Sequence, residues 1–174
     1  MNEAAVVGTR QASGAGAAAA ARLLALLLPL ALLGGALGSQ YLGGLHPCEM
    51  CYWQRWPHAA AILLAALAFT APARSSRART FTLLAAFAIA ISGAIGVYHA
   101  GVEAKIFEGF TQCTALSKSS STAELLKEIV NAPLVRCDEV QFRFLGISMA
   151  GWNAILSLGG ASLILALTLK GRRA

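Results

Sequence analysis

Charged residues are scarce in this sequence, and their scarcity excludes an ordinary soluble domain. Only 13% of the 174 residues are charged, whereas a soluble domain carries about 25%. No carboxylate lies inside any of the long apolar stretches, so nothing indicates the ion coupling of a transporter. The chain instead has 57% hydrophobic residues and a mean hydropathy of +0.63. That excess of apolar residues needs lipid as its solvent.

The apolar residues gather in four blocks rather than at a helical or strand period. The blocks lie at 23–42, 52–71, 81–98 and 147–169. A spanning helix needs about 20 residues. The second block meets that length only if 52–58 forms its interfacial first turns, because its uninterrupted part is 59–71. The sequence therefore predicts an all-α membrane protein with a single domain over 22–170, built as a four-helix transmembrane bundle.

The net charge of +6 is also found in nucleic-acid-binding proteins, but its distribution excludes a nucleic-acid partner. With four spans, one side of the membrane holds eight basic residues and one acidic residue: Arg10, Arg22, Arg74, Arg77, Arg79, Lys170, Arg172, Arg173 and Glu3. The other side holds six basic and seven acidic residues. Basic residues near helix ends mark the cytoplasmic side. Both termini, including the basic tail at 171–174, are therefore expected in the cytoplasm.

This orientation leaves two outer segments, 43–56 and 99–146. All four cysteines lie within them: Cys48, Cys51, Cys113 and Cys137. Cytosolic thiols are kept reduced, so cysteines confined to the outer side indicate disulfide chemistry. The sequence alone does not choose among the alternative pairings.

The N-terminal segment is open to two interpretations. Residues 1–21 are rich in alanine and glycine and are expected to form a disordered tail. Arg22, the apolar run 23–33 and the small residues 34–39 also follow the order of a cleaved signal peptide. The apolar run continues to Leu42 and leads directly into the first cysteine pair, which favours a retained helix.

The second outer segment is too long to be a passive connection. Ser121-Thr122-Ala123-Glu124 is a capping box that opens a short helix, which ends before Pro133. One face of this helix is apolar: Leu125, Leu126, Ile129 and Val130. We expect it to lie in the membrane interface and to tether the loop. The alternative is a helix packed against the spans.

Cys48-Glu49-Met50-Cys51 is a Cys-x-x-Cys pair, which closes a small disulfide that is easily reduced and reformed. If the second span begins near Cys51, Arg55 lies on the same helical face. Its charge and the helix N-terminus would then stabilise a thiolate at Cys51, although Arg55 would equally reach lipid headgroups. A zinc site made by all four cysteines is a further alternative, disfavoured because the second pair is widely spaced.

The run Pro47-Cys48-Glu49-Met50-Cys51-Tyr52-Trp53-Gln54-Arg55, four spans and a distal cysteine pair resemble the disulfide bond formation protein B family. The resemblance extends through Tyr98-His99 and through the run from Cys137 to Met149, and it covers about residues 23–170. Met50 stands where the family often has leucine, and the interval between the distal cysteines is short. The short interval leaves room for a specialised paralogue with a dedicated partner.

This resemblance implies a thiol-disulfide oxidoreductase of the bacterial inner membrane. It would reoxidise a periplasmic thioredoxin-fold dithiol oxidase (DsbA-like) and pass the electrons to a membrane quinone, ubiquinone in preference to menaquinone. The implied pairs are Cys48 with Cys51 and Cys113 with Cys137. The partner attacks Cys113 and the freed Cys137 attacks Cys48. Cys51 then leaves as a thiolate that faces the quinone, with Arg55 close by.

The remaining polar and aromatic groups near the outer ends give weaker signals. His99, at the edge of the hydrocarbon, is a candidate donor of a hydrogen bond or proton to a quinone carbonyl, or else an ordinary interfacial histidine. Three aromatic residues fit an interfacial belt: Tyr52, Trp53 and Trp56. No role is assigned to His46 or His58.

Two other functions fit the sequence less well. In a quinone-linked reductase similar to the vitamin K epoxide reductase family, the proximal cysteine motif comes late in the chain, whereas here Cys48 and Cys51 come first. A non-enzymatic membrane scaffold would use its disulfides only to brace the outer loops, and such bridges would resist mild reductants.

Overall fold

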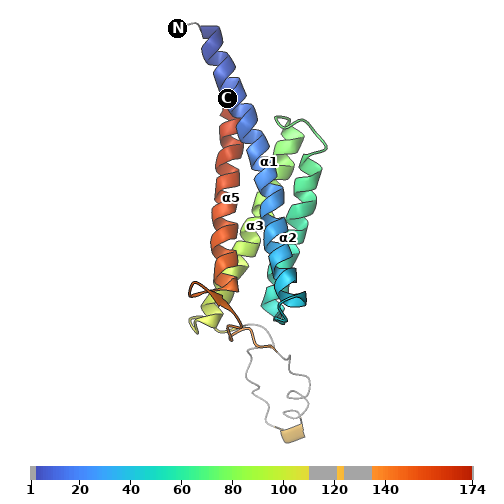
Figure 1. Ribbon diagram of the computed structural model, residues 1–174, viewed down its shortest axis with the longest axis vertical. Helices are drawn as coiled ribbons and strands as arrows, with labels where there is room; N and C mark the ends of the chain where they lie inside the picture. The colour runs from blue at the N-terminus through green and yellow to red at the C-terminus, as the bar shows by residue number, and fades with distance from the viewer. Residues whose placement is uncertain (1–2, 110–120, 124–134, 174) are drawn as a thin grey trace.

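The computed structural model describes residues 3–109, 121–123 and 135–173. Four long helices run side by side in this part of the chain (Figure 1): α1 (Glu3–Tyr41), α2 (Glu49–Ala68), α3 (Ser76–Glu103) and α5 (Met149–Arg173). A two-stranded antiparallel hairpin precedes α5 and consists of β1 (Arg143–Phe144) and β2 (Ile147–Ser148). The predicted all-helical class is therefore confirmed, apart from this short hairpin.

Three of the helices are long and apolar enough to cross a membrane: 13–41, 76–103 and 149–171. Helix α2 has 20 residues, about 30 Å at 1.5 Å per residue, which matches the thickness of the hydrocarbon core. Its composition is more polar than that of the other three. Large apolar side chains face outward around the bundle, among them Leu27, Leu63 and Phe87, each more than half exposed. Such a surface suits lipid, and these are the features of a helical membrane protein.

Helix α1 begins at Glu3, so the prediction of a disordered tail over 1–21 is wrong for residues 3–21. Two causes are visible. Alanine, which dominates this stretch, is the strongest helix former. The segment also packs against α5, because a Cβ atom on Gly171 would lie only 3.2 Å from the carbonyl oxygen of Gly14 and 3.3 Å from the Cβ of Ala18.

Small residues allow the helices to approach closely in the core. The buried cluster is made mostly of alanines from all four helices: Ala21, Ala25, Ala61, Ala65, Ala85, Ala86, Ala88, Ile89, Ala161 and Ile164. At Gly96 of α3, a Cβ atom would lie 3.0 Å from the backbone nitrogen of Ala154 and 3.1 Å from the carbonyl oxygen of Ala150 in α5. Close backbone contact provides packing energy where lipid supplies no hydrophobic drive. It also brings polar groups of α5 within reach of α3.

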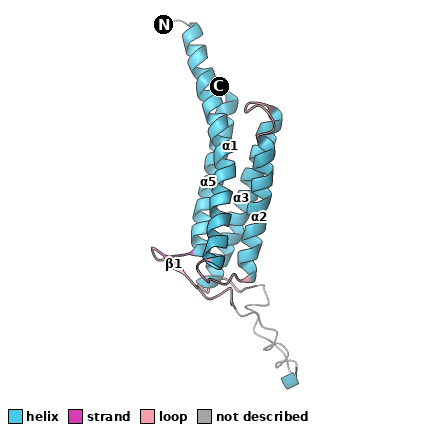
Figure 2. Ribbon diagram, turned by 45° about the vertical axis from the view of Figure 1, so that its right-hand side comes forward, coloured by secondary structure: helices cyan, strands magenta, loops and turns pink. Residues whose placement is uncertain are grey.

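The two ends of the bundle have different contents. Both chain termini and the turn between α2 and α3 lie at one end, which we call the terminal end (Figures 1 and 2). The connection from α1 to α2, the hairpin and the described residues that follow α3 lie at the opposite end, which we call the cysteine end. Helix α2 begins there, with Cys48 as its N-cap residue. A helix that begins near Cys51 was the condition for placing Arg55 on the same helical face as Cys51, and the structure meets that condition.

The hairpin was not predicted from the sequence. It turns at Leu145 and Gly146, whose φ angles of 51° and 79° are those of the tight turns that join antiparallel strands. The indole nitrogen of Trp152 donates to the carbonyl oxygen of Phe144 over 2.9 Å, which fixes the hairpin to the first turn of α5.

The predicted interfacial helix lies largely outside the described residues. Thr122 and Ala123 are helical, but the four residues of its apolar stripe and Cys113 fall in 110–120 and 124–134, which the structure does not describe.

Candidate active site

Three cysteines from two distant parts of the chain meet at the cysteine end. Cys48 and Cys51 are thiols whose sulfur atoms lie 3.1 Å apart. Cys137 is fully buried and packs in one cluster with Cys48. Cys48 is the central member, because its thiol donates to the sulfur of Cys51 and packs against Cys137. Its interactions with Cys137 and Cys51, together with burial, raise the pKa of Cys48.

Ion pairs and a backbone contact hold the third cysteine in place. The neighbouring residue Asp138 accepts two hydrogen bonds from Arg136, at 2.9 and 3.0 Å. Lys105, which follows the end of α3, lies 2.5 Å from the same carboxylate. These cations hold the pKa of Asp138 well below its usual range. Farther along, Gln141 donates to the carbonyl oxygen of His46 over 2.6 Å. The segment is thus anchored to both α3 and the α1–α2 connection.

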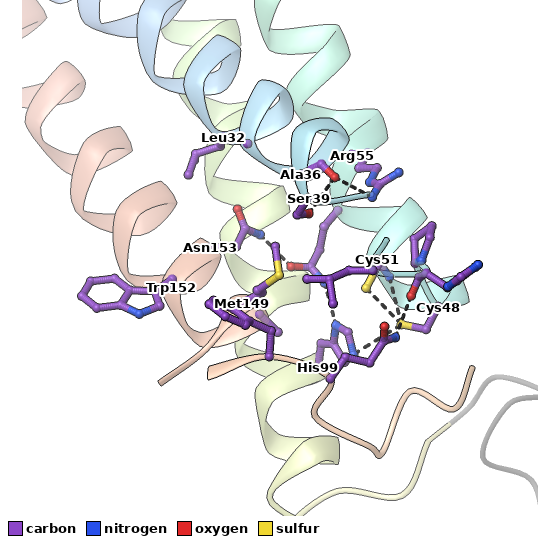
Figure 3. Close-up of a pocket in the computed structure, with 18 of the residues that line it drawn as sticks. Leu32, Ala36, Ser39, Cys48, Cys51, Arg55, His99, Met149, Trp152 and Asn153 are labelled. Atoms are coloured by element: carbon purple, nitrogen blue, oxygen red, sulfur yellow. Dashed lines mark hydrogen bonds between the residues drawn. The ribbon is translucent and has the colours of Figure 1, made fainter. Parts of the chain in front are cut away.

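The proton of His99 can be assigned from its neighbours. His99 is 3% exposed, and its Nε2 lies 3.5 Å from the sulfur of Cys48 (Figure 3). Gln54 donates from Nε2 to the carbonyl oxygen of Met50 over 3.1 Å, which fixes the orientation of its amide. The same nitrogen lies 2.8 Å from Nδ1 of His99, so Nδ1 is the acceptor. Neutral His99 therefore carries its proton on Nε2 and donates toward Cys48.

Asn153 of α5 extends this arrangement across the bundle. Its Nδ2 donates to the carbonyl oxygen of Ser92 over 3.2 Å and to Oε1 of Gln54 over 2.7 Å. That backbone contact orients the Asn153 amide, so its Oδ1 accepts from Nε2 of His58 over 2.9 Å. Ser92 donates its hydroxyl to the carbonyl oxygen of Gln54 over 2.8 Å. Four buried side chains and the half-buried Asn153 form a network that joins α2, α3 and α5, which we call the buried polar network: Gln54, His58, Ser92, His99 and Asn153.

A cavity of about 320 Å³ lies between the cysteine pair, α1 and α5. Its polar wall includes Cys51, Arg55 and His99, and its apolar wall includes Leu32 and Met149. Sites for small organic ligands have volumes of about 300 to 1,000 Å³ and combine apolar walls with a few polar groups. The lining therefore suits a small, largely apolar ligand that carries hydrogen-bond acceptors.

Arg55 makes its closest contacts with α1 rather than with Cys51. Its guanidinium donates to Oε1 of Gln40 over 2.5 Å and to the carbonyl oxygen of Ala36 over 3.2 Å. It also lies 5.1 Å from the centre of the Tyr52 ring. Arg55 nevertheless lines the same cavity as Cys51. The bonds to α1 keep its charge at the wall of the cavity.

Cys48, Cys51 and His99 also form a candidate metal site, since their ligand atoms lie within 4.8 Å of one another. In a tetrahedral zinc site with Zn–S bonds of about 2.3 Å, two sulfur ligands stand roughly 3.8 Å apart. The two sulfur atoms here are closer, at 3.1 Å. Their separation favours a redox pair over a metal centre.

The structure brings together most of the residues that the sequence singled out. Cys48, Cys51, Cys137 and His99 make one contact cluster, and Arg55 shares their cavity. Cys113 lies outside the described residues. The three aromatic residues at the start of α2 are exposed, as an interfacial belt requires: Tyr52, Trp53 and Trp56.

The network behind the cysteines was not predicted from the sequence. Gln54 was recognised only as part of a motif, no role was expected for His58, and nothing pointed to Asn153. A signal was present, because Gln54 and His58 are four residues apart and so lie on one helical face. Polar residues inside an apolar helix usually face the interior of a bundle. Glu103 was not predicted either. It lines the cavity, and its Oε1 lies 3.9 Å from Nε2 of His99.

Comparison with known proteins identifies the family. The model for disulfide bond formation protein DsbB matches residues 18–167. The chain is 34% identical to disulfide bond formation protein B of Methylococcus capsulatus over 150 residues, covering 82% of this chain and 90% of the relative. It is 28% identical over 156 residues to the protein of the same name from Xanthomonas oryzae pv. oryzae, covering 87% and 90%. No solved structure gives a significant match.

The matched region contains the Cys-x-x-Cys pair, Cys137 and all five residues of the buried polar network. The resemblance seen in the sequence is thereby confirmed, and the chain belongs to the DsbB family of membrane disulfide bond formation proteins.

Proposed function

We propose that this chain is a quinone-dependent protein-disulfide oxidoreductase that crosses the bacterial inner membrane four times. The cysteine end faces the periplasm and the terminal end faces the cytoplasm. Its partner is a thioredoxin-fold dithiol oxidase (DsbA-like), and its electron acceptor is a membrane quinone, ubiquinone in preference to menaquinone. The length of α2 supports a fourth crossing. The basic residues at the terminal end support the orientation.

The observation that carries the proposal is that Cys48 lies 3.1 Å from Cys51 and packs in one cluster with Cys137. Thiol-disulfide exchange needs both an attacking and a leaving sulfur next to the attacked sulfur. The partner's thiolate attacks Cys113 of a Cys113–Cys137 disulfide and frees Cys137. Cys137 then attacks Cys48, the bond between Cys48 and Cys51 breaks, and its electron pair leaves on Cys51.

The buried polar network supports the second half of the cycle. The partner's second thiolate displaces Cys113, which attacks Cys137, re-forms the Cys113–Cys137 disulfide and releases Cys48 as a thiolate. Cys48 then closes the disulfide with Cys51, and the two electrons leave to the quinone. The Nε2 proton of His99 points at the sulfur of Cys48, and a hydrogen bond to a thiolate stabilises its charge. Gln54 and Asn153 act as positioning residues, because they hold the imidazole in the tautomer that has this proton.

The cavity beside Cys51 has a lining that fits a quinone. Leu32 and Met149 would contact the ring and Arg55 would face a carbonyl oxygen. The single Nε2 proton of His99 would be shared between Cys48 and the quinone. When bound, the quinone supplies an acceptor for two electrons and two protons. Both cysteines of the pair line this cavity together with Arg55, so the negative charge left on Cys51 is formed beside a fixed cation.

Visible absorption of the purified Cys48→Ala variant with added ubiquinone tests the proposal. The substitution leaves Cys51 without its pairing thiol, and a thiolate beside a quinone ring absorbs visible light by charge transfer. We expect a coloured protein whose band disappears when Cys51→Ala is added and weakens when Arg55→Ala is added. A colourless protein that binds ubiquinone no better than lipid does would overturn the proposal.

A further inference from the structure

A second cavity lies at the terminal end of the bundle, far from the cysteines. It has a volume of about 110 Å³, room for three or four water molecules at roughly 30 Å³ each. All four helices or their connections contribute to its wall. The lining residues are Ala18, Ala21, Arg22, Ala73, Arg74, Arg79, Thr82, Thr168 and Gly171.

The wall of this cavity is positively charged. Arg22, Arg74 and Arg79 line it, and none of its lining residues is acidic. Among the ion pairs of the described residues, none involves these three arginines. Helix α3 also begins beside the cavity and has no acidic residue in its first turn, so its positive end adds to the same potential. Three arginines that line one cavity without a carboxylate favour the binding of an anion there.

Arg22 is fixed in place by contacts that do not involve its Nε atom. One of its terminal nitrogens donates to the carbonyl oxygens of Ala68 and Ala71 at 3.2 and 3.0 Å, and the guanidinium lies 4.7 Å from the centre of the Phe69 ring. Its Nε is buried and has no hydrogen-bond partner in the described residues. A buried donor is normally satisfied, so this Nε is able to bind an acceptor atom of a ligand.

The other polar groups of the wall do not compete for this role. Thr82 donates its hydroxyl to the carbonyl oxygen of Ala78 over 2.8 Å, and Thr168 donates to that of Ile164 over 2.7 Å. Among the residues that line the cavity, the arginines are therefore the side chains with donors left for a ligand. Guanidinium groups match the oxygen atoms of phosphate in charge and geometry.

We propose that this cavity binds a phosphate group, supplied by an anionic phospholipid or by phosphate in solution. Its position at the end of the apolar helices places it at headgroup depth, where basic pockets between helices hold lipid phosphates. Bound there, the phosphate joins α1, the α2–α3 turn and α3 through Arg22, Arg74 and Arg79.

A matched pair of arginines makes the test specific. Arg79 lines the cavity, whereas Arg77, two residues earlier in the same helical turn, donates to the hydroxyl of Thr70 over 3.0 Å and does not line it. The full chain is purified in a neutral detergent, depleted of lipid and titrated with phosphatidylglycerol, phosphatidylcholine or inorganic phosphate. Native mass spectrometry counts the bound lipid, and the shift in the thermal unfolding midpoint reports both lipid and phosphate. Arg22 is kept intact because its bonds to α2 are part of the fold.

We expect wild-type protein and Arg77→Gln to bind phosphatidylglycerol equally and in preference to phosphatidylcholine. Arg74→Gln and Arg79→Gln should each weaken that binding by about tenfold. A response to inorganic phosphate with the same variant pattern would support the site and assign it to the soluble anion. Equal losses in Arg77→Gln and Arg79→Gln would show diffuse attraction to a basic surface and overturn the proposal. Equal binding of the two lipids together with no response to inorganic phosphate would also overturn it.

Discussion

The Nδ2 atom of Asn153 lies 2.7 Å from Oε1 of Gln54, and this contact joins α5 to α2 directly behind the cysteine pair. Its importance comes from what it determines at a distance. It holds the Gln54 amide with its nitrogen toward His99, which places the imidazole proton on the side of Cys48. Asn153 on the last helix thus influences which ring nitrogen of His99 carries the proton, and His99 contacts Cys48.

Replacing Gln54 with leucine should remove this control. The substitution keeps the size of the side chain but leaves Nδ1 of His99 without its donor. The cost in free energy of unfolding should be about 1–3 kcal/mol, as for other buried polar groups that lose a partner. In ¹⁵N spectra of histidine-labelled protein, wild-type His99 should show a bare Nδ1 and a protonated Nε2, whereas the variant should show a mixture of tautomers.

The control for this experiment is Ser162→Ala, because Ser162 is exposed and bonds only within its own helix. Its His99 signals should match those of the wild type. Protonation of His99 at Nδ1 in the wild-type protein would contradict the assignment.

Replacing Asp138 with asparagine should slow the transfer of electrons from Cys137 to the Cys48–Cys51 disulfide by a few-fold. The change weakens the contacts with Arg136 and Lys105 that hold the segment beside α3. Glu139→Gln is the matched control, since Glu139 is 68% exposed and lies 3.8 Å from Arg136. Rapid mixing with a reduced partner, followed by acid quenching and alkylation of free thiols, measures the rate. Equal rates in both variants would show that the anchor does not position Cys137.

This anchor should be insensitive to pH over the physiological range. The pKa of Asp138 is lowered from 3.8 by its hydrogen bonds with Arg136 and Lys105. Its stabilising contribution is therefore complete above the ordinary value and is lost only as the pH falls through the lower value of the folded protein. Between about pH 5 and 8, the ratio of the Asp138→Asn rate to the wild-type rate should stay constant. A ratio that approaches one at pH 5 would contradict this.

The close contact between α3 and α5 predicts a strong effect at Gly96. A leucine there would collide with the backbone of Ala150 and Ala154 and push Asn153 away from α2, at a cost of about 1–3 kcal/mol for overpacking. Gly159→Leu is the control, because nothing lies within 4 Å of a Cβ atom at that position. Thermal unfolding in detergent should show a lower midpoint for Gly96→Leu alone. Similar midpoints for the two variants would mean that the helices can separate without loss.

Removal of metal should leave the redox activity unchanged. Cys48, Cys51 and His99 could together ligate an ion, but the sulfur atoms are closer than zinc ligands. Dialysis against a chelator, followed by metal analysis and an assay of partner oxidation, tests this expectation. A loss of activity that zinc restores would return the metal site to consideration.

The sequence predicted the helices and the cysteines well because both leave strong local signals. Apolar blocks of about 20 residues and a Cys-x-x-Cys pair can be read without knowledge of tertiary contacts. The start of α2 could also be placed near Cys51 from the end of the polar connection and the beginning of the apolar block. Helix α1 was underestimated because alanine and glycine together resemble a disordered segment, and its packing against α5 has no local signature.

The contacts that define the site depend on distant residues, and the sequence did not reveal them. Gln54 and Asn153 are separated by 99 positions, and no periodicity connects them. Arg55 was correctly placed near Cys51, yet its partners Ala36 and Gln40 lie in another helix. Cys137 could be joined to Cys48 only through the family resemblance.

The buried polar network also fixes the register of the helices against one another. Sliding α5 by one turn against α2 would break the bonds of Asn153 to both Gln54 and Ser92. The depth of the cysteine pair is therefore set by contacts between the helices and not by the outer connections. The outer segment that carries Cys113 is then free to change in length and sequence from one protein to another, because its redesign does not shift the register of the reactive pair. One helical frame can in this way be adapted to partners of different shape.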